Sequence, residues 1–380
     1  MNKQTRQKNK DLVINVGQET DGVFISQPAP KERRRIEWSL INKHIYINPK
    51  FSRLPRFVAI ILVVLIICTL MFVIRPRLVK RQPAIKNNHL VDIGELKVDG
   101  DARVITSETE LFSAADKTSA IQCSLLLNEH VKIKSAPKDG FLAVETDDGL
   151  SGFIAAQALA VDHSESVESE RIKDVYIFRG PKRVMSDARS GNTLLYLHAG
   201  TKLWADYQNE GLLRLILPDG RRGWINDDNV QVVEPEGKIL HPAAVAPEQY
   251  FLSAALMFNQ ATYMPHGLSY DGIDMPGVIY IAGLLNNIQL PRTLEGIAQA
   301  GSEIQIVREK DEPSFDALEP GDVIVFGDGH DMNTPKFLGV LIEDKRVLIN
   351  PLNESVIREY DLNYDNALRK KVISARRIFS

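Results

Sequence analysis

The chain has 380 residues, of which 44% are hydrophobic and 25% are charged, and its formal net charge at pH 7 is −3. This composition is typical of globular proteins, and the length allows two or three domains. It excludes a chain that is disordered throughout. One short basic run, KERRR at 31–35, is too little to indicate a nucleic-acid-binding protein.

The N-terminal part of the chain combines a basic tail with one long apolar segment. Residues 1–56 carry an excess of basic side chains, which favours a disordered tail, either solvated or lying on anionic lipid. Residues 57–74, FVAIILVVLIICTLMFVI, contain no charge. As a helix they would extend roughly 27 Å, close to the thickness of a bilayer core. They predict a single-pass transmembrane helix that serves as a signal anchor, and a buried core helix is the alternative.

Basic residues near the apolar segment indicate an orientation. They are more numerous before it than after it, which predicts a cytoplasmic N-terminus. Residues 75–98 then form a linker, and the later domains lie outside the cytoplasmic (inner) membrane. Cys68 falls inside the apolar segment and Cys123 in a strand-like run, so no disulfide joins them. We expect neither a metal nor a cofactor.

An internal repeat follows. Residues 139–161 align without a gap to residues 210–232, at an offset of 71. Both copies place alternating apolar residues around an Asp-Gly pair, which is typical of a β-hairpin whose glycine has a positive φ. An aromatic residue follows the next glycine in each copy, Phe153 in the first and Trp224 in the second.

Further strand-like runs precede each hairpin and predict two small β modules, over 99–163 and 170–235. The endings DGLSGFI and DGRRGWI resemble those of the bacterial SH3 fold. In that family such modules bind cell-wall peptides or pack against a catalytic domain. The resemblance makes Trp224 a candidate ligand contact, and the alternative is that Trp224 and Phe153 are only core residues.

From residue 245 to the end, the pattern changes to mixed α and β. A helix is predicted from Pro247, and a second helix follows Asp274 and runs through Leu285. The runs GDVIVFG, FLGVLIE and RVLINP then predict strands. A helix that begins at a nucleophile, followed by a sheet that carries the base, is the layout of papain-like cysteine hydrolases.

Several segments resemble one family of that class. They read GIDMPGVIY, NIQLPRTLEGIAQAG, LEPGDVIVFG and FLGVLIEDKRVLINP, and the likeness covers 247–378. The family is NlpC/P60, whose members cleave peptides of the bacterial cell wall. The resemblance implies a papain-like α+β domain over 245–380. The expected fold class is therefore α+β, with a membrane helix, two SH3-like β-barrels and this domain.

The residues at the family's catalytic positions cannot perform its chemistry. Its nucleophilic cysteine falls on Met275, its base histidine on Phe337, and its third, orienting residue on Asn350. A thioether has no ionisable proton and a phenyl ring cannot accept one. Pro276 also removes an N–H from the helix start, where an oxyanion would find its donors. The pattern predicts a domain without catalytic residues.

Other residues could still take part in the site. His330, in a polar loop, could swing toward it, and His266 lies near the expected cleft, but neither supplies a nucleophile. In related dipeptide-releasing members, the residues that match Tyr263 and Asp274 hold the free amine of the substrate. The alternative is that Asp274 only caps the helix and Tyr263 only packs.

Three functions remain open at this stage. The first is binding, either of peptidoglycan peptides or as a scaffold or regulator of an envelope hydrolase. The second is an active peptidase of the γ-D-glutamyl-diamino acid type that uses non-standard residues. The third is a purely structural part of an envelope complex.

Overall fold

The computed structural model describes residues 95–379, with gaps at 236, 238–244, 311, 332 and 352–353. The predicted tail (1–56), the predicted membrane helix (57–74) and most of the linker lie outside the described residues. Within the described part, no helix is long and apolar enough to cross a bilayer. The structure is mostly β-sheet and only 13% helical. The expected fold class, α+β with a single-pass membrane helix, is therefore wrong: only two of the described helices exceed four residues, and strands account for most of the regular structure.

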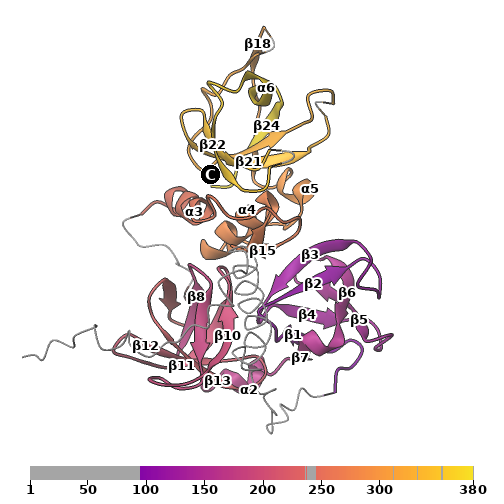
Figure 1. Cartoon of the computed structure of the whole chain (residues 1–380), viewed down its shortest axis with the longest axis vertical. Helices are drawn as coiled ribbons and strands as arrows, with labels where there is room; N and C mark the ends of the chain where they lie inside the picture. The colour runs from indigo at the N-terminus through magenta and orange to yellow at the C-terminus, as the bar shows by residue number, and fades with distance from the viewer. Residues whose placement is uncertain are drawn as a thin grey trace, which may run out of the picture. The chain divides into compact units, whose positions relative to one another are not determined.

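The first module is a seven-stranded antiparallel sheet in the order β3-β2-β6-β5-β4-β1-β7 (Figure 1). Its strands are β1 (Asp101–Val104), β2 (Glu108–Phe112), β3 (Ile121–Leu126), β4 (His130–Ile133), β5 (Phe141–Thr146), β6 (Ser151–Ala155) and β7 (Leu159–Val161). The 3-10 turn η3 (Ala156–Ala158) precedes β7, and the short helix α2 (Ser164–Val167) follows it.

The second module repeats this sheet in the order β10-β9-β13-β12-β11-β8-β14. Its strands are β8 (Lys173–Ile177), β9 (Lys182–Met185), β10 (Thr193–Leu197), β11 (Lys202–Asn209), β12 (Leu212–Ile216), β13 (Arg222–Asn226) and β14 (Val230–Val233). Each strand of the second sheet occupies the same place as the strand whose number is seven lower in the first sheet. The repeat in the sequence thus corresponds to two sheets of one topology.

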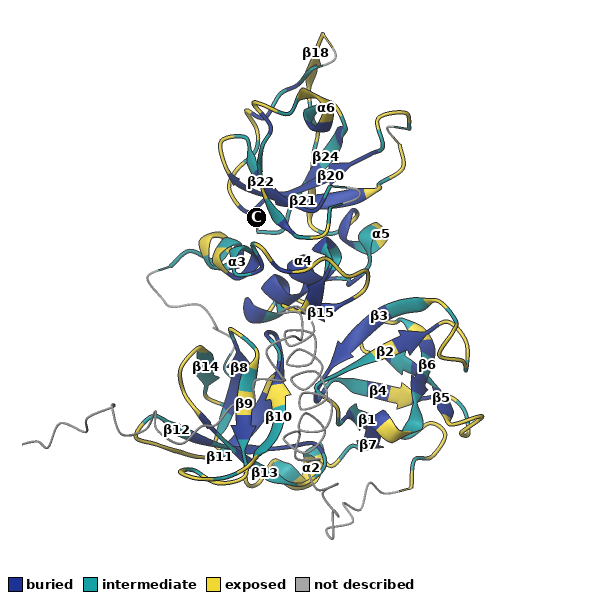
Figure 2. Cartoon of the chain, in the orientation of Figure 1, coloured by how far each residue is buried: buried dark blue, intermediate teal, exposed yellow. Residues whose placement is uncertain are grey.

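The turns explain why the repeat is visible in the sequence. Gly149 joins β5 to β6 with φ +84°, and Gly220 joins β12 to β13 with φ +80°. An L side chain is strained at such angles, so both hairpins depend on glycine at this point. Each sheet encloses an apolar cluster of its own, visible in Figure 2 as dark blue strands. Val104, Leu142 and Ile154 are fully buried in the first, and Val175, Leu203 and Leu213 in the second.

The C-terminal part contains two longer helices and a six-stranded antiparallel sheet in the order β17-β24-β20-β21-β22-β23. The helices are α3 (Pro247–Leu256), α4 (Met275–Leu285), α5 (Leu294–Ile297) and α6 (Asn366–Arg369). The sheet strands are β17 (Ser302–Ile304), β20 (Val323–Phe326), β21 (Phe337–Glu343), β22 (Arg346–Ile349), β23 (Arg358–Asp361) and β24 (Val372–Arg377). Two short hairpins complete it: β15 (Leu268–Ser269) with β16 (Gly272–Ile273), and β18 (Arg308–Glu309) with β19 (Glu312–Pro313).

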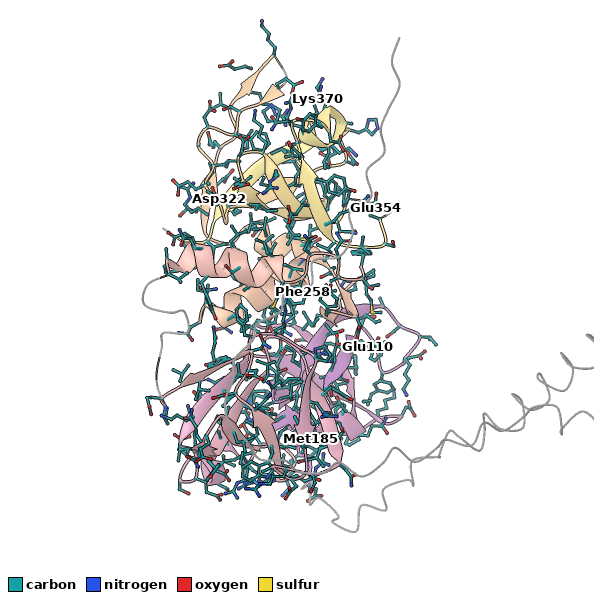
Figure 3. The ribbon with its side chains drawn as sticks, turned by 60° about the vertical axis from the view of Figure 1, so that its left-hand side comes forward. Glu110, Met185, Phe258, Asp322, Glu354 and Lys370 are labelled. Atoms are coloured by element: carbon teal, nitrogen blue, oxygen red, sulfur yellow. The ribbon has the colours of Figure 1, made fainter. Side chains whose placement is uncertain are left out.

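A buried ion pair fixes the middle of this sheet. Asp322, directly before β20, accepts hydrogen bonds from Nε and Nη2 of Arg377 on β24, at 3.0 and 2.8 Å. Figure 3 labels Asp322 at this position. Its side chain is 3% exposed, and the two parallel bonds hold the strands in register. The aspartate of the LEPGD segment is therefore a structural residue.

The two faces of the sheet pack against different apolar clusters. Val325, Leu338 and Val340 belong to the cluster that includes α3 and α4. Phe326 and Phe337 belong to a second cluster, which α6 joins through Leu368. Because side chains alternate along a strand, a shift of one residue moves a side chain from one cluster to the other. This alternation determines which residues can meet at the start of α4.

Candidate functional site

The candidate site is the start of helix α4. Asp274 is its N-cap, with an extended backbone at φ −110° and ψ 174°. One carboxylate oxygen accepts a hydrogen bond from the Gly277 N–H at 2.8 Å, and the other accepts from the His266 N–H at 2.7 Å. Pro276 fits the first turn, where its missing N–H breaks no helical bond. Met275 thus occupies the first helical position, where the resemblance places a nucleophile.

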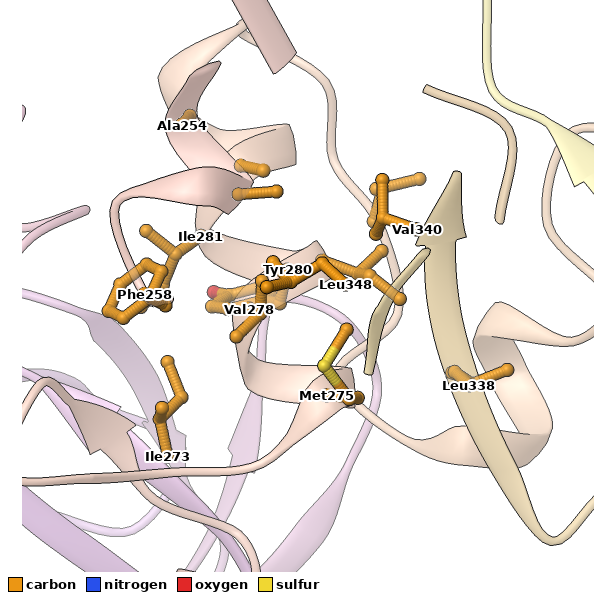
Figure 4. Packing of buried hydrophobic residues seen from close by; sticks show 14 of the residues in the cluster. Ala254, Phe258, Ile273, Met275, Val278, Tyr280, Ile281, Leu338, Val340 and Leu348 are labelled. Atoms are coloured by element: carbon orange, nitrogen blue, oxygen red, sulfur yellow. The ribbon is translucent and has the colours of Figure 1, made fainter. Parts of the chain in front are cut away.

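Met275 is enclosed by apolar side chains. It is 3% exposed and belongs to the cluster that contains Val278 of α4, Leu338 of β21 and Leu348 of β22 (Figure 4). A thioether in such surroundings acts as a space-filling hydrophobic group. The position expected for a nucleophile is therefore part of the core.

Phe337 does not lie with Met275. Its ring stacks on Phe326, with centroids 5.0 Å apart and an interplanar angle of 8°, in the cluster on the other face of the sheet. The next residue, Leu338, faces the cluster of Met275. The alignment of FLGV therefore assigns the family's base to Phe337. The side chain on the same face of the sheet as Met275 is that of the next residue, Leu338.

Asn350 is buried and holds a loop. It is 6% exposed, and its Nδ2 donates to the carbonyl oxygens of Glu354 at 3.1 Å and Val356 at 2.8 Å. These bonds connect Glu354 and Val356 to the end of β22. The polar side chain at the family's third position is thus engaged with backbone acceptors, and none of its hydrogen-bond partners among the described residues is a histidine.

The loop before α4 is fastened to the first module. The carbonyl oxygen of His266 accepts from the Ser124 N–H at 3.0 Å, and the Leu268 N–H donates to Glu108 Oε1 at 3.0 Å. His266 itself has φ +64°, a conformation set by this tight loop. The backbone of His266 links Asp274 to the first module, because its N–H donates to Asp274 and its carbonyl oxygen accepts from Ser124.

Tyr263 and Asp274 remain neighbours, as the resemblance implies. Tyr263 is 38% exposed, and burial together with the Asp274 charge raises the pKa of its hydroxyl. Burial likewise raises the pKa of the Asp274 carboxyl, although the two backbone donors oppose this rise. Since both oxygens of Asp274 already accept hydrogen bonds, the geometry matches a helix cap.

The raised pKa of Asp274 predicts a pH dependence. A carboxyl whose folded pKa exceeds its unfolded value, about 3.9, stabilises the fold below that value and loses this contribution as pH rises through the folded pKa. Asp274→Asn removes the titration. We therefore expect the free energy of unfolding of the unchanged protein, relative to this variant, to fall between pH 4 and pH 7 in urea titrations. A difference that stays constant or rises over this range would contradict the assignment.

The other two candidate residues lie away from the start of α4. His330 is exposed in the loop between β20 and β21, where its N–H donates to Asp328 Oδ1 at 2.7 Å. Trp224, on β13, is half-buried outside the apolar cluster of its module. Its ring lies 5.4 Å from that of Tyr207, and the Arg214 guanidinium lies over it at 5.7 Å.

One residue near the site was given no role by the sequence. Arg292, from the LPRT segment, has a 4% exposed side chain that pairs with Asp148 at 2.8 Å and Glu129 at 2.9 Å. It also donates to the Ser124 carbonyl at 3.0 Å and to the Tyr280 hydroxyl at 2.7 Å. The LPRT segment resembles the family's pattern, but most of the partners of Arg292 lie far away in the sequence. Arg292 joins the first module to α4.

The sequence matches no family model and no curated protein. Solved structures do resemble the chain. An NlpC/P60 family protein from Bacillus cereus ATCC 10987 is 17% identical over 74% of this chain and all of its own, with a TM-score of 0.61. An NlpC/P60 endopeptidase from Photobacterium damselae subsp. piscicida is 11% identical over 73% of this chain and 72% of its own, with a TM-score of 0.51. At these identities the likeness establishes the fold: the chain has the fold of NlpC/P60 proteins.

Proposed function

We propose that this protein is a catalytically inactive relative of cell-wall peptidases that binds cell-wall peptides. The observation that carries the proposal is Met275, which occupies the first position of α4, buried among apolar side chains. Peptide cleavage at this place needs an ionisable nucleophile beside a proton acceptor. Met275 supplies no such nucleophile, and the strand residue on its face, Leu338, supplies no acceptor.

The surrounding residues support loss of chemistry with retention of structure. Residues 240–380 contain no cysteine. Asp274 still caps the helix, and Asn350 still anchors a loop. The side chains of Asp274 and Asn350 thus have structural partners, as expected of a domain that has the family's shape without its reaction.

Binding of peptides is supported by the fold and by the modules. The NlpC/P60 fold is found in proteins of cell-wall metabolism, and the endings of the two β modules resemble those of bacterial SH3 domains, the finer assignment proposed here. Tyr263, exposed beside Asp274, and Trp224, on its sheet with Tyr207 and Arg214, offer aromatic surface to a ligand.

Cleavage and binding can be measured in one experiment. The purified full-length protein is incubated with insoluble peptidoglycan and, separately, with soluble muropeptides, beside an active NlpC/P60 enzyme as a positive control. We expect saturable co-sedimentation with peptidoglycan and no new peptide by mass spectrometry. Peptide release would show an active peptidase instead. Absence of both release and binding would leave scaffolding of an envelope complex as the function.

A further inference from the structure

A pocket lies between the second module and the C-terminal end of α3. Its volume is about 420 Å³, within the range of about 300–1,000 Å³ common for ligand sites. The turn after β8, the turn before β11, the end of α3 and the turn between β15 and β16 line it. Its lining includes none of Met275, Phe337 and Asn350, so this pocket is a different place from the start of α4.

The turn that carries Arg179 is held in place by its backbone. The Arg179 N–H donates to the Asn229 carbonyl oxygen at 3.2 Å. The next residue, Gly180, has no room for a side chain, since a Cβ atom there would lie 2.9 Å from the Cα atom of His198. The turn of Arg179 therefore packs closely on the turn of His198, and both residues line the pocket.

Among the described residues that line the pocket, Arg179 is the only one with a permanent charge. Its side chain is exposed, and its guanidinium has no carboxylate partner in the described part of the chain. The carboxylate that contacts the pocket wall is that of Glu359, which accepts from Asn259 Nδ2 at 3.0 Å and lies 3.6 Å from Arg346. The uncompensated charge at the pocket is therefore positive, which favours an anionic ligand.

The end of α3 does not cancel this charge. A helix C-terminus carries about half a negative charge on its free carbonyl groups. Here the carbonyl oxygens of Ala255 and Leu256 accept from the N–H groups of Phe258 and Asn259, at 3.1 and 3.0 Å. Figure 3 labels Phe258 in this turn. The side chains of Leu256 and Met257 are half-buried and line the pocket, so an apolar wall accompanies the cation.

Two further side chains bring polar groups to the pocket. Tyr270 is 42% exposed, and its hydroxyl donates to the Asn259 carbonyl oxygen at 3.4 Å, which leaves the hydroxyl oxygen as an acceptor. The imidazole of His198 is half-buried and has no hydrogen-bond partner among the described residues, so a ring N–H is available as a donor. The pocket thus offers donors for a carboxylate and an acceptor for an amide N–H.

We propose that this pocket binds the C-terminal end of a peptide, whose carboxylate pairs with Arg179 and whose last side chain, a small apolar one, packs on Leu256 and Met257. Guanidinium and carboxylate groups match in charge and in hydrogen-bond geometry. The assignment rests on the proposed function, because cell-wall peptides commonly end in alanine with a free carboxylate.

The test uses full-length protein and the dipeptide N-acetyl-D-alanyl-D-alanine in isothermal titration calorimetry. Arg179→Gln is expected to bind it about threefold to tenfold more weakly, because an exposed charge-assisted pair is lost. The dipeptide with a C-terminal amide is expected to bind the unchanged protein as weakly as the acid binds this variant. Arg183→Gln is the matched control: Arg183 is exposed on β9 of the same module and does not line the pocket, so the affinity is expected to stay unchanged.

Changes to the ligand test the apolar wall. N-acetyl-D-alanyl-glycine lacks one methyl group and is expected to bind about threefold to fourfold more weakly. Acetate carries the carboxylate without the peptide and is expected to bind about tenfold more weakly than the dipeptide. Because the Arg179 guanidinium has no carboxylate partner to lose, Arg179→Gln is expected to keep its melting temperature. Weaker binding by this variant then reports a lost ligand contact and not a damaged fold.

The outcomes distinguish the pocket from the wider function. Equal affinity of the unchanged protein and Arg179→Gln for the dipeptide overturns the pocket assignment, as does an equal loss in Arg183→Gln, which would be an effect of overall charge. Equal binding of acetate or of the glycine peptide would show an anion site that does not recognise a peptide end, and no measurable binding of the dipeptide overturns the assignment outright. Co-sedimentation with peptidoglycan keeps the proposed function in each of these cases, and that function fails only if co-sedimentation fails.

Discussion

Replacing Arg292 with alanine is expected to lower the free energy of unfolding by about 3–5 kcal/mol, the range for breaking a buried ion pair from one side. The substitution leaves Asp148 and Glu129, whose side chains are 9% and 18% exposed, without their cation. The Ser124 carbonyl and the Tyr280 hydroxyl each lose a donor. Urea unfolding followed by circular dichroism measures the effect.

An exposed arginine provides the control for Arg292. Arg346 is 44% exposed and pairs with Glu343, itself 65% exposed, within one hairpin. Water screens such a pair, so Arg346→Ala is expected to cost less than about 1 kcal/mol. Similar losses for the two variants would show that the Arg292 network does not join the first module to α4. A separate early unfolding transition, already present in the unchanged protein, would show the same.

The sequence was most informative where structure depends on neighbours along the chain. The Asp-Gly turns, the alternating runs around them and the 71-residue offset indicated two sheets of one kind, and Gly149 and Gly220 have the positive φ expected of them. Helix α4 begins at Met275 as expected, because Asp274 and Pro276 are local signals for a helix start.

Contacts between distant segments could not be read in this way. Arg292 meets Asp148 across 144 residues, and no local pattern indicates such a pair. Asn128 contacts the Lys202 carbonyl across 74 residues only because two modules meet, so this contact has no motif in the sequence. The fold class was misjudged for a related reason: the short strands of the C-terminal part, such as β17, depend on pairing with distant partners such as β24.

On strand β21, a shift of one residue decides which side chain lies on the same face of the sheet as Met275. Matching FLGV to the family's pattern fixed the glycine at Gly339 and placed Phe337 at the position of the base. The sheet pairs Phe337 with Phe326, and both rings face the cluster away from α4. Since the period of a strand is two residues, a one-residue error inverts the predicted contact. Sequence matching cannot detect it, because Phe337 and Leu338 are both apolar and both buried.

The pair of substitutions that the family's pattern suggests, Met275→Cys with Phe337→His, is therefore expected to give no peptide cleavage and to cost about 3 kcal/mol of stability. The imidazole replaces a ring that is 6% exposed and stacked on Phe326, and it finds no polar partner in that apolar cluster. It also lies on the face of β21 opposite the introduced thiol. Met275→Cys alone is expected to be inactive as well, since burial keeps a thiol protonated.

The matched variant is Met275→Cys with Leu338→His, because Leu338 shares the apolar cluster of Met275. Only here does an imidazole lie on the same side of the sheet as the introduced thiol, so its charge favours the thiolate. The rate of alkylation of the introduced thiol by iodoacetamide, followed at that site by mass spectrometry between pH 6 and pH 9, reports its pKa. We expect a lower pKa in the Leu338→His pair than in the Phe337→His pair. The reverse order, or cleavage of muropeptides by the Phe337→His pair, would mean that residue 337 faces the start of α4, and the proposal of an inactive site built on Leu338 would fail.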